Sequence, residues 1–404
     1  MPVNLSPPEH LAPVPGIRVA ATSLGVRKVA RDDLTVFEIP AGAAVAVTFT
    51  RNAFCAAPVT LAREHLRAHV PRYLVINAGN ANAGTGAAGM HAARRVCALV
   101  AAAGGCAPEQ VLPFSTGVIG EILDTGPFEA AVPQAVRALD HDAWLRAAHA
   151  IMTTDIVCKG VSRSFELNGR THTITGIAKG SGMIRPDMAT MLCFIATDAP
   201  VDGALLQQVL GDAVDVSFNC VTVDGDTSTN DACVLIATGT EARLVDANSA
   251  GVQALRAAVT EVCTWLAHAV VRDGEGATKF ITVEVSGGAE VLECRQVAYT
   301  VAHSPLVKTA MFASDANWGR ILAAVGRAGV ANLDIDAIRM HLGDVLIVEH
   351  GARAAGYREE LGAAVMAEPE IHVRIKLGRG DARACVWTCD LSHEYVSINA
   401  DYRS

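Results

Sequence analysis

The chain mixes strand-like and helix-like apolar patterns in an irregular order, and this order most restricts its fold. Short runs rich in Val, Ile, Thr and Phe, punctuated by Gly and Pro, predict strands at 17–26, 34–39, 44–50, 72–77, 191–197, 221–223, 233–237, 279–285, 293–301, 371–377 and 384–388. Apolar residues three and four apart predict helices at 90–103, 133–139, 143–152, 205–216, 249–271 and 317–327. Because no regular strand–helix–strand repeat emerges, we expect a mixed α/β body.

One hairpin is specified locally. Residues 165–178 alternate between apolar and polar side chains on both sides of Asn168-Gly169. Asn-Gly suits the left-handed backbone of a two-residue hairpin turn, so the sequence predicts a β-hairpin here.

Composition excludes several classes of protein. The chain has 404 residues, enough for two or three domains or one large α/β body. Apolar residues make up 51% and charged residues 19%, which supports a sizeable core and not disorder. A net charge of −9 lacks the basic surface of a nucleic-acid binder. We therefore expect no nucleic-acid partner.

Apolar runs and cysteine spacing predict the localisation and the metal content of the chain. The N-terminal residues contain no basic stretch followed by an apolar one, and apolar runs such as 96–103 and 265–271 fall short of the ~20 residues that span a bilayer. We expect a cytoplasmic protein with no membrane partner. Eleven cysteines without a C-x-x-C pair favour reduced, buried thiols and no metal site.

A glycine-rich loop imitates a dinucleotide site. Residues 84–89 (GTGAAG) match G-x-G-x-x-G between a predicted strand and helix. However, residues 78–83 separate the strand from the first glycine, and no acidic residue ends a second strand about 20 positions later. The alternative is a structural loop in which Asn77, Asn80 and Asn82 bond nearby backbone.

Residues 179–192 (KGSGMIRPDMATML) carry the first candidate chemistry. Two glycines and Pro186 permit a strained turn that leads into an apolar strand close to Thr190. Such a turn suits attack of the Thr190 hydroxyl on the Ala189 carbonyl, which would cut the chain there. The freed amino group, with an ordinary pKa near ~8, could then serve as base for its own hydroxyl. An ordinary turn into a strand is the alternative from these residues alone.

Residues 113–121 (PFSTGVIGE) carry the second candidate. A threonine hydroxyl beside a glycine amide is a plausible pair of donors to an oxyanion. A Ser-Thr-Gly turn leading to a helix is the alternative interpretation.

The segment 179–192 resembles the cleavage site of the glutamate N-acetyltransferase/ornithine acetyltransferase family, which cleaves itself and acts in arginine biosynthesis. Further blocks agree in the same order along essentially the whole chain. They are 77–84 (NAGNANAG), 115–121 (STGVIGE), 152–155 (MTTD), 219–231 (NCVTVDGDTSTND), 273–279 (DGEGATK), 304–310 (SPLVKTA), 317–322 (NWGRIL) and 395–404 (YVSINADYRS).

The resemblance implies roles for particular residues. Cleavage would fall between Ala189 and Thr190, giving an α chain of 1–189 and a β chain of 190–404 intertwined in one catalytic body. Thr190 would be the nucleophile, and Thr116 with the Gly117 amide would form the oxyanion hole. The substrate contacts implied are Thr153, Lys179, Thr190, Glu275, Asn399 and Ser404.

The resemblance also implies a fold and a reaction. The expected fold is an αββα-type sandwich like that of the self-processing aminopeptidases. The expected reaction moves an acetyl group from N-acetylornithine to glutamate through an acetyl-Thr190 ester. No metal or prosthetic group is implied, acetyl-CoA remains open as a second acetyl donor, and the expected assembly is α2β2.

Two alternatives from other classes stay open. A self-processing aminopeptidase would share the nucleophile but hydrolyse peptides, and glutamate would not accept the acyl group. A nucleotide- or ligand-binding oligomer would use residues 84–89 and leave Thr190 uncut.

Overall fold

The structure is a computed structural model that describes residues 2–25, 31–185, 191–241, 244 and 249–401. It divides into two compact units, which we describe separately. Unit 1 contains residues 1–6, 220–225 and 271–404, and unit 2 contains residues 7–219 and 226–270. These units are distinct from the predicted α and β chains, which would be products of cleavage and stay a prediction.

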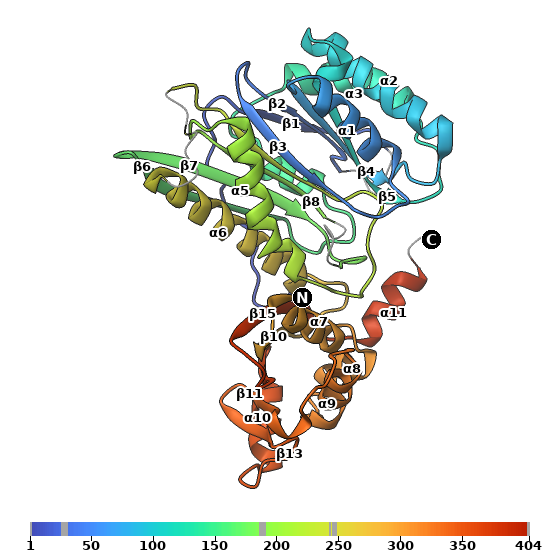
Figure 1. Cartoon of the computed structure of the whole chain (residues 1–404). Helices are drawn as coiled ribbons and strands as arrows, with labels where there is room; N and C mark the ends of the chain where they lie inside the picture. Colours follow the sequence, from blue (N-terminus) through green and yellow to red (C-terminus); the bar gives the residue numbers. More distant parts are fainter. Residues whose placement is uncertain (1, 26–30, 186–190, 242–243, 245–248, 402–404) are drawn as a thin grey trace. The chain divides into compact units, whose positions relative to one another are not determined.

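Unit 2 contains a four-stranded sheet in the order β1-β2-β4-β5. Strand β4 pairs in parallel with β5, and the other neighbours pair antiparallel. Buried apolar residues of helices α2 and α3 form a core against the outer face of this sheet, and α1 packs beside β5 (Figure 1). The bounds are β1 Arg18–Thr22, β2 Leu34–Glu38, β4 Tyr73–Asn80, β5 Val111–Val118, α1 Ala57–Ala68, α2 Gly86–Gly104 and α3 Gly126–Arg137.

A second sheet of unit 2 has the order β3-β9-β8-β7-β6. The predicted hairpin is confirmed: β6 and β7 pair antiparallel around Asn168 and Gly169, whose φ angles are 52° and 76°. Helices α5 and α6 lie along the outer face of this sheet (Figure 1). The bounds are β3 Ala44–Phe49, β6 Lys159–Leu167, β7 Arg170–Lys179, β8 Leu192–Thr197, β9 Ala232–Ala237, α4 Trp144–Ala150, α5 Gly203–Asp215 and α6 Ala250–Arg272.

The two sheets of unit 2 share an apolar core. Phe37 of β2 stacks on Phe194 of β8 with ring centroids 5.5 Å apart, and Phe114 of β5 meets the same ring edge-on at 5.3 Å. Trp144 of α4 packs edge-on against Phe37. Helices therefore cover two face-to-face sheets, and this confirms the predicted αββα sandwich (Figure 1).

Helix α6 has 23 residues, which is longer than the apolar runs that the sequence analysis found too short to span a bilayer. Among the described residues, α6 is the one helix that is both long enough and apolar enough to cross a membrane, judged by length and composition alone. Its most apolar window is 56% buried, and Val262 and Leu266 lie against Gly176 of β7. A Cβ at Gly176 would come within 2.9 Å of Val262, so the glycine permits this close packing. This is the burial of a core helix, and a single such helix is weak evidence for a membrane span.

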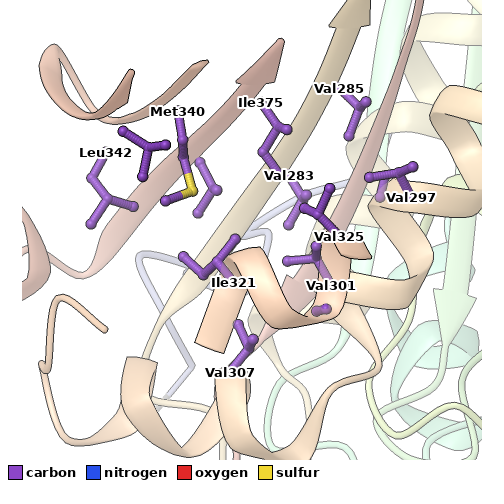
Figure 2. Close-up of a cluster of buried hydrophobic side chains, with 14 of the residues drawn as sticks. Val283, Val285, Val297, Val301, Val307, Ile321, Val325, Met340, Leu342 and Ile375 are labelled. Carbon is purple, nitrogen blue, oxygen red and sulfur yellow. The ribbon is translucent and has the colours of Figure 1, made fainter. Parts of the chain in front are cut away.

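Unit 1 contains a six-stranded sheet in the order β13-β12-β11-β14-β10-β15, in which only the β10–β14 pair is parallel. Figure 2 shows Val283 and Val285 of β10 among apolar side chains of α7, α8 and α9. The bounds are β10 Phe280–Gly288, β11 Arg339–Leu342, β12 Val345–Glu349, β13 Ala352–Arg353, β14 Glu370–Lys376, β15 Ala382–Cys389, α7 Val291–Ala302, α8 Pro305–Phe312, α9 Trp318–Gly326, α10 Glu359–Ala367 and α11 His393–Ala400.

The predicted strand at 293–301 is wrong, because this segment lies within helix α7. Its buried residues are spaced by three and four positions, which is the period of a helix face: Cys294, Val297, Ala298, Val301 and Ala302. The predicted strand at 221–223 is also wrong, since Val221 forms only an isolated bridge with Trp387. Both segments contain β-branched residues, which favour strands by type but do not by themselves establish one.

Candidate active site

Strand β5 ends at a close approach to β4. Gly117 pairs with Gly79 and has a φ of 132°, which side chains rarely allow. A Cβ at Gly117 would lie 2.2 Å from the carbonyl carbon of Gly79. Only glycine therefore fits after Thr116. The alternative interpretation, a Ser-Thr-Gly turn leading to a helix, is wrong, because these residues end strand β5.

The sandwich brings together two residues that the sequence analysis singled out separately. Lys179 ends β7 and Thr116 lies near the end of β5, and both are buried. The Nζ of Lys179 donates a hydrogen bond of 2.9 Å to Oγ1 of Thr116. An ammonium group can only donate, so the threonine oxygen accepts. The hydroxyl hydrogen of Thr116 is thereby directed to another acceptor.

A buried carboxylate supports this pair. Asp155 accepts hydrogen bonds from Nζ of Lys159 at 2.6 Å, from the Gly180 amide at 2.7 Å and from the Thr153 amide at 2.8 Å. Burial raises the pKa of Asp155, but the positive charges of Lys159 and Lys179 and the Gly180 amide outweigh it. The pKa is held well below its usual range, so Asp155 is ionised and orders the segments that carry Thr153 and Lys179.

Asp155→Asn should destabilise the fold by about 3–5 kcal/mol, because it leaves the buried Lys159 ammonium without its counter-charge. Because the folded pKa of Asp155 is lowered, its contribution to stability is complete above its unfolded pKa of about 4 and declines as the pH falls below that value. Urea unfolding from pH 7 down to pH 3 tests both points: the variant should start lower and lose less on acidification.

Glu129→Gln is the control, since it breaks the exposed Arg95–Glu129 pair and should leave the urea midpoint unchanged. An Asp155→Asn protein as stable as the parent at pH 7 would contradict the role assigned to this carboxylate.

The placement of the other predicted residues in unit 2 is mixed. Thr153 presents its amide to Asp155, while the hydroxyl of the neighbouring Thr154 is 2.6 Å from that of Ser181. The predicted cleavage residues Ala189 and Thr190 lie outside the described residues. The description resumes at Met191, directly before β8.

Two polar residues that directly precede β9 received no role from the sequence. The carboxyl of Asp231 accepts a 3.1 Å hydrogen bond from the Met191 amide. The side-chain amide of Asn230 donates to the carbonyl of Ser115 at 2.9 Å. Asp155 was missed in the same way. All three fall inside the blocks 152–155 and 219–231, so those blocks were the available signal.

Unit 1 brings together a second pair of predicted residues. Nδ2 of Asn399 on α11 donates a 2.8 Å hydrogen bond to Oε2 of Glu275, which is buried. Gly276 has a φ of 69°, and Ser392 donates a hydrogen bond of 2.6 Å to its carbonyl, which holds this turn against the start of α11. The predicted contact residue Ser404 lies outside the described residues.

The dinucleotide-like loop is filled by its own side chains. Asn77 donates to the Asn80 carbonyl, Asn80 accepts from the Asn82 amide, and Asn82 donates to the Gly89 carbonyl. This confirms the predicted bonding of the asparagines to nearby backbone. A Cβ at Gly89 would lie 1.8 Å from the Thr85 hydroxyl oxygen, so this glycine serves internal packing of α2.

In the part of the chain that the structure describes, no group of three or more His, Cys, Asp or Glu side chains is placed to hold one metal ion. The eleven cysteines are free thiols, and most are buried.

The layers of unit 2, with a buried hydroxyl–ammonium pair joining its two sheets, define an α/β protein of the αββα sandwich class. Comparison of the sequence with known families then identifies the family within this fold class. The model of the ArgJ family matches residues 18–404, and the chain belongs to this family.

Curated relatives agree along the whole length. The Arginine biosynthesis bifunctional protein ArgJ of Pseudomonas syringae pv. tomato is 55% identical over 406 residues, covering 100% of both chains. The protein of the same name from Methylococcus capsulatus is 56% identical, over 98% of this chain and 97% of its own. These matches confirm the resemblance and the expectation of an enzyme of arginine biosynthesis.

Solved structures match over shorter stretches. A crystal structure of Arginine biosynthesis bifunctional protein argJ from Bacillus halodurans covers 51% of this chain and 96% of its own, with 38% identity and a TM-score of 0.49. Ornithine acetyltransferase complexed with ornithine from Mycobacterium tuberculosis covers 43% and 93%, with 32% identity and a TM-score of 0.38. The family assignment rests on the sequence matches.

Proposed function

We propose that this chain transfers the acetyl group of N2-acetyl-L-ornithine to L-glutamate through an acetyl ester on Thr190, giving L-ornithine and N-acetyl-L-glutamate. The observation that carries the proposal is the buried Lys179–Thr116 hydrogen bond of 2.9 Å. It leaves the Thr116 hydroxyl hydrogen for an external acceptor and adds a positive charge behind it, as an oxyanion site requires.

The transfer proceeds in two half-reactions. The Thr190 hydroxyl gives its proton to the Thr190 α-amino group as its oxygen attacks the acetyl carbonyl, and the resulting oxyanion receives hydrogen bonds from the Thr116 hydroxyl and the Gly117 amide. The leaving amine takes that proton as the C–N bond breaks, and ornithine departs. The amine of glutamate then attacks the ester and gives a proton to the Thr190 α-amino group, which passes it to the departing Thr190 oxygen. Splitting one transfer into two easier steps is the benefit of a covalent intermediate.

The nucleophile is produced by the chain itself. Thr190 attacks the Ala189 carbonyl, the peptide bond is exchanged for an ester, and water hydrolyses that ester. The products are an α chain of 1–189 and a β chain of 190–404. Strands β7 and β8, from opposite sides of this position, are neighbours in one sheet, which supports products that stay associated after cleavage.

Substrate contacts follow the chemistry of the predicted residues. Lys179 offers a cation to a carboxylate, and Glu275 offers an anion to an ammonium group. Asn399, already hydrogen-bonded to Glu275, orients that carboxylate. Thr153, Thr190 and Ser404 complete the assigned contacts. We assign no metal or prosthetic group.

The word bifunctional in the relatives' names supports a second reaction, acetylation of glutamate with acetyl-CoA as donor. Release of free thiol from acetyl-CoA only in the presence of glutamate would establish it, and no release would limit the enzyme to acetylornithine.

We further propose that the protein is cytoplasmic and forms an α2β2 assembly. Light scattering of the purified protein would test the assembly.

Intact mass under denaturing conditions, followed by an acetyl-transfer assay, tests the proposal. We expect two polypeptides of 189 and 215 residues, the second beginning at Thr190, and N-acetylglutamate formed only when both substrates are present. Acetylornithine hydrolysis that ignores glutamate would favour the aminopeptidase alternative. A single uncut chain without transfer would favour the ligand-binding alternative.

A further inference from the structure

The dipeptide Asn230-Asp231 contacts both halves of the proposed catalytic machinery. The two residues directly precede β9, and their exposed fractions are 6% and 1%. The Nδ2 of Asn230 donates to the carbonyl of Ala81 at 2.7 Å and to that of Ser115 at 2.9 Å. The Ser115 carbonyl belongs to the peptide group that joins Ser115 to Thr116. Asn230 therefore holds the backbone that presents the oxyanion residue.

Asp231 holds Met191, the residue that follows the proposed nucleophile. Its Oδ1 accepts the Met191 amide at 3.1 Å, and the next amide along, that of Ala232, donates to the Met191 carbonyl at 3.1 Å. The nitrogen of Met191 is bonded covalently to the carbonyl carbon of Thr190. Both polar groups of the residue after the nucleophile are therefore hydrogen-bonded to the start of β9.

The chemical state of Asp231 determines which substitutes can replace it. Burial raises the pKa of Asp231 well above its usual range, and the Met191 amide, Lys179 and the hydroxyls of Ser228 and Thr50 only partly oppose this. Its Oδ2 is buried and has no hydrogen-bond partner in the described part of the chain. An asparagine side chain has nearly the same size as aspartate and also presents an oxygen that can accept from the Met191 amide.

We propose that Asn230 and Asp231 are positioning residues that together hold the Ser115–Thr116 peptide and Met191, the residue bonded to the proposed nucleophile, for both self-cleavage and acetyl transfer. The inference rests on the proposed function. Adjacent residues of one chain have little freedom relative to each other, so the hydrogen bonds from Asn230 and to Asp231 connect two backbones that are remote in sequence. Misplacing reacting groups by about 1 Å can cost ~100-fold in rate.

Two substitutions of equal size test the proposal because their predicted results are opposite. Asp231→Asn keeps an acceptor for the Met191 amide and should retain cleavage and kcat within about threefold. Asn230→Asp loses a donor to the Ala81 and Ser115 carbonyls, and should lower kcat by about 10–100-fold while the KM for acetylornithine changes little. kcat is counted per cleaved chain, from intact mass, and the cleavage rate is followed after synthesis in a cell-free system.

Asp198→Ala is the matched control. Asp198 directly follows the opposite end of β8 and accepts the amide of Thr173 on β7 at 2.8 Å, so its loss removes a side-chain-to-backbone hydrogen bond far along the same sheet. It should lower the melting temperature without changing kcat per cleaved chain. A purely structural role for Asn230 would make Asn230→Asp behave like this control.

The proposal is overturned if Asn230→Asp keeps the parent kcat and cleavage rate, or if Asp231→Asn loses as much as Asn230→Asp. Thr190→Ala separates this failure from failure of the proposed function. If Thr190→Ala still turns over, the proposed function itself is wrong, whereas an inactive Thr190→Ala with an unimpaired Asn230→Asp removes only the positioning role.

Discussion

Thr190→Ala should yield a single uncut chain of 404 residues and lower acetyl transfer by more than about 10⁴-fold, which is the scale of losing a nucleophile. The same hydroxyl forms the cleavage ester and the acetyl ester, so one substitution should abolish both. Thr190→Ser is the matched variant, because it keeps an oxygen nucleophile at the same position. It should still cleave and retain measurable turnover.

Intact mass and N-acetylglutamate formation read out the two reactions independently. Cleavage without turnover in Thr190→Ala would place the self-cleavage nucleophile elsewhere. Turnover without cleavage would remove the acetyl-Thr190 ester from the mechanism. Trapping radiolabelled acetyl on the 215-residue fragment of the parent enzyme, in the absence of glutamate, would identify the ester directly.

Thr116→Ala should lower kcat/KM by about 100–1000-fold, the usual cost of removing one oxyanion donor. The structure adds a reason for a large effect, because the Lys179 ammonium also loses its 2.9 Å acceptor inside the sandwich. Thr116→Ser should recover most of the rate, since serine supplies the same acceptor to Lys179 and the same hydroxyl hydrogen.

The Thr116 comparison requires equal amounts of cleaved enzyme, because slower cleavage would imitate slower transfer. Equal melting temperatures of the alanine and serine variants would separate catalysis from stability. A Thr116→Ala enzyme with unchanged kcat/KM per cleaved chain would refute the oxyanion role and leave the Lys179 contact as a packing feature.

Local patterns predicted the elements that depend on neighbouring residues. The β6–β7 hairpin follows from Asn168-Gly169, and α5, α6 and α9 follow from apolar residues at helical spacing. Prediction failed where composition and spacing disagreed, as in α7, whose valines suggested a strand while their period is helical. Helix α1 and strand β11 were not predicted. Strand β11 has only four residues, and so short an element carries weak periodicity.

The sequence by itself determined the chemical candidates and the family. Long blocks such as 179–192 and 219–231 name specific residues, and their order along the chain agrees with one family from residue 18 to residue 404. Two candidates can be recognised without coordinates: a hydroxyl-bearing residue after a glycine-rich turn, and a Thr-Gly pair. In each case the residues that suggest the chemistry are neighbours in the sequence.

Only the tertiary structure decided which candidates meet. Thr116 and Lys179 are 63 positions apart and hydrogen-bond because β5 and β7 lie in sheets that face each other. Strand order and sheet packing depend on apolar contacts between residues far apart in the sequence, such as those around Phe194. The local spacing of apolar residues does not show which strands will pair or which sheets will pack together. The same reason explains Asp155 and Asp231, which are ordinary acidic residues in the sequence. In the fold, Lys159 and Lys179 lower the pKa of Asp155, whereas burial raises the pKa of Asp231.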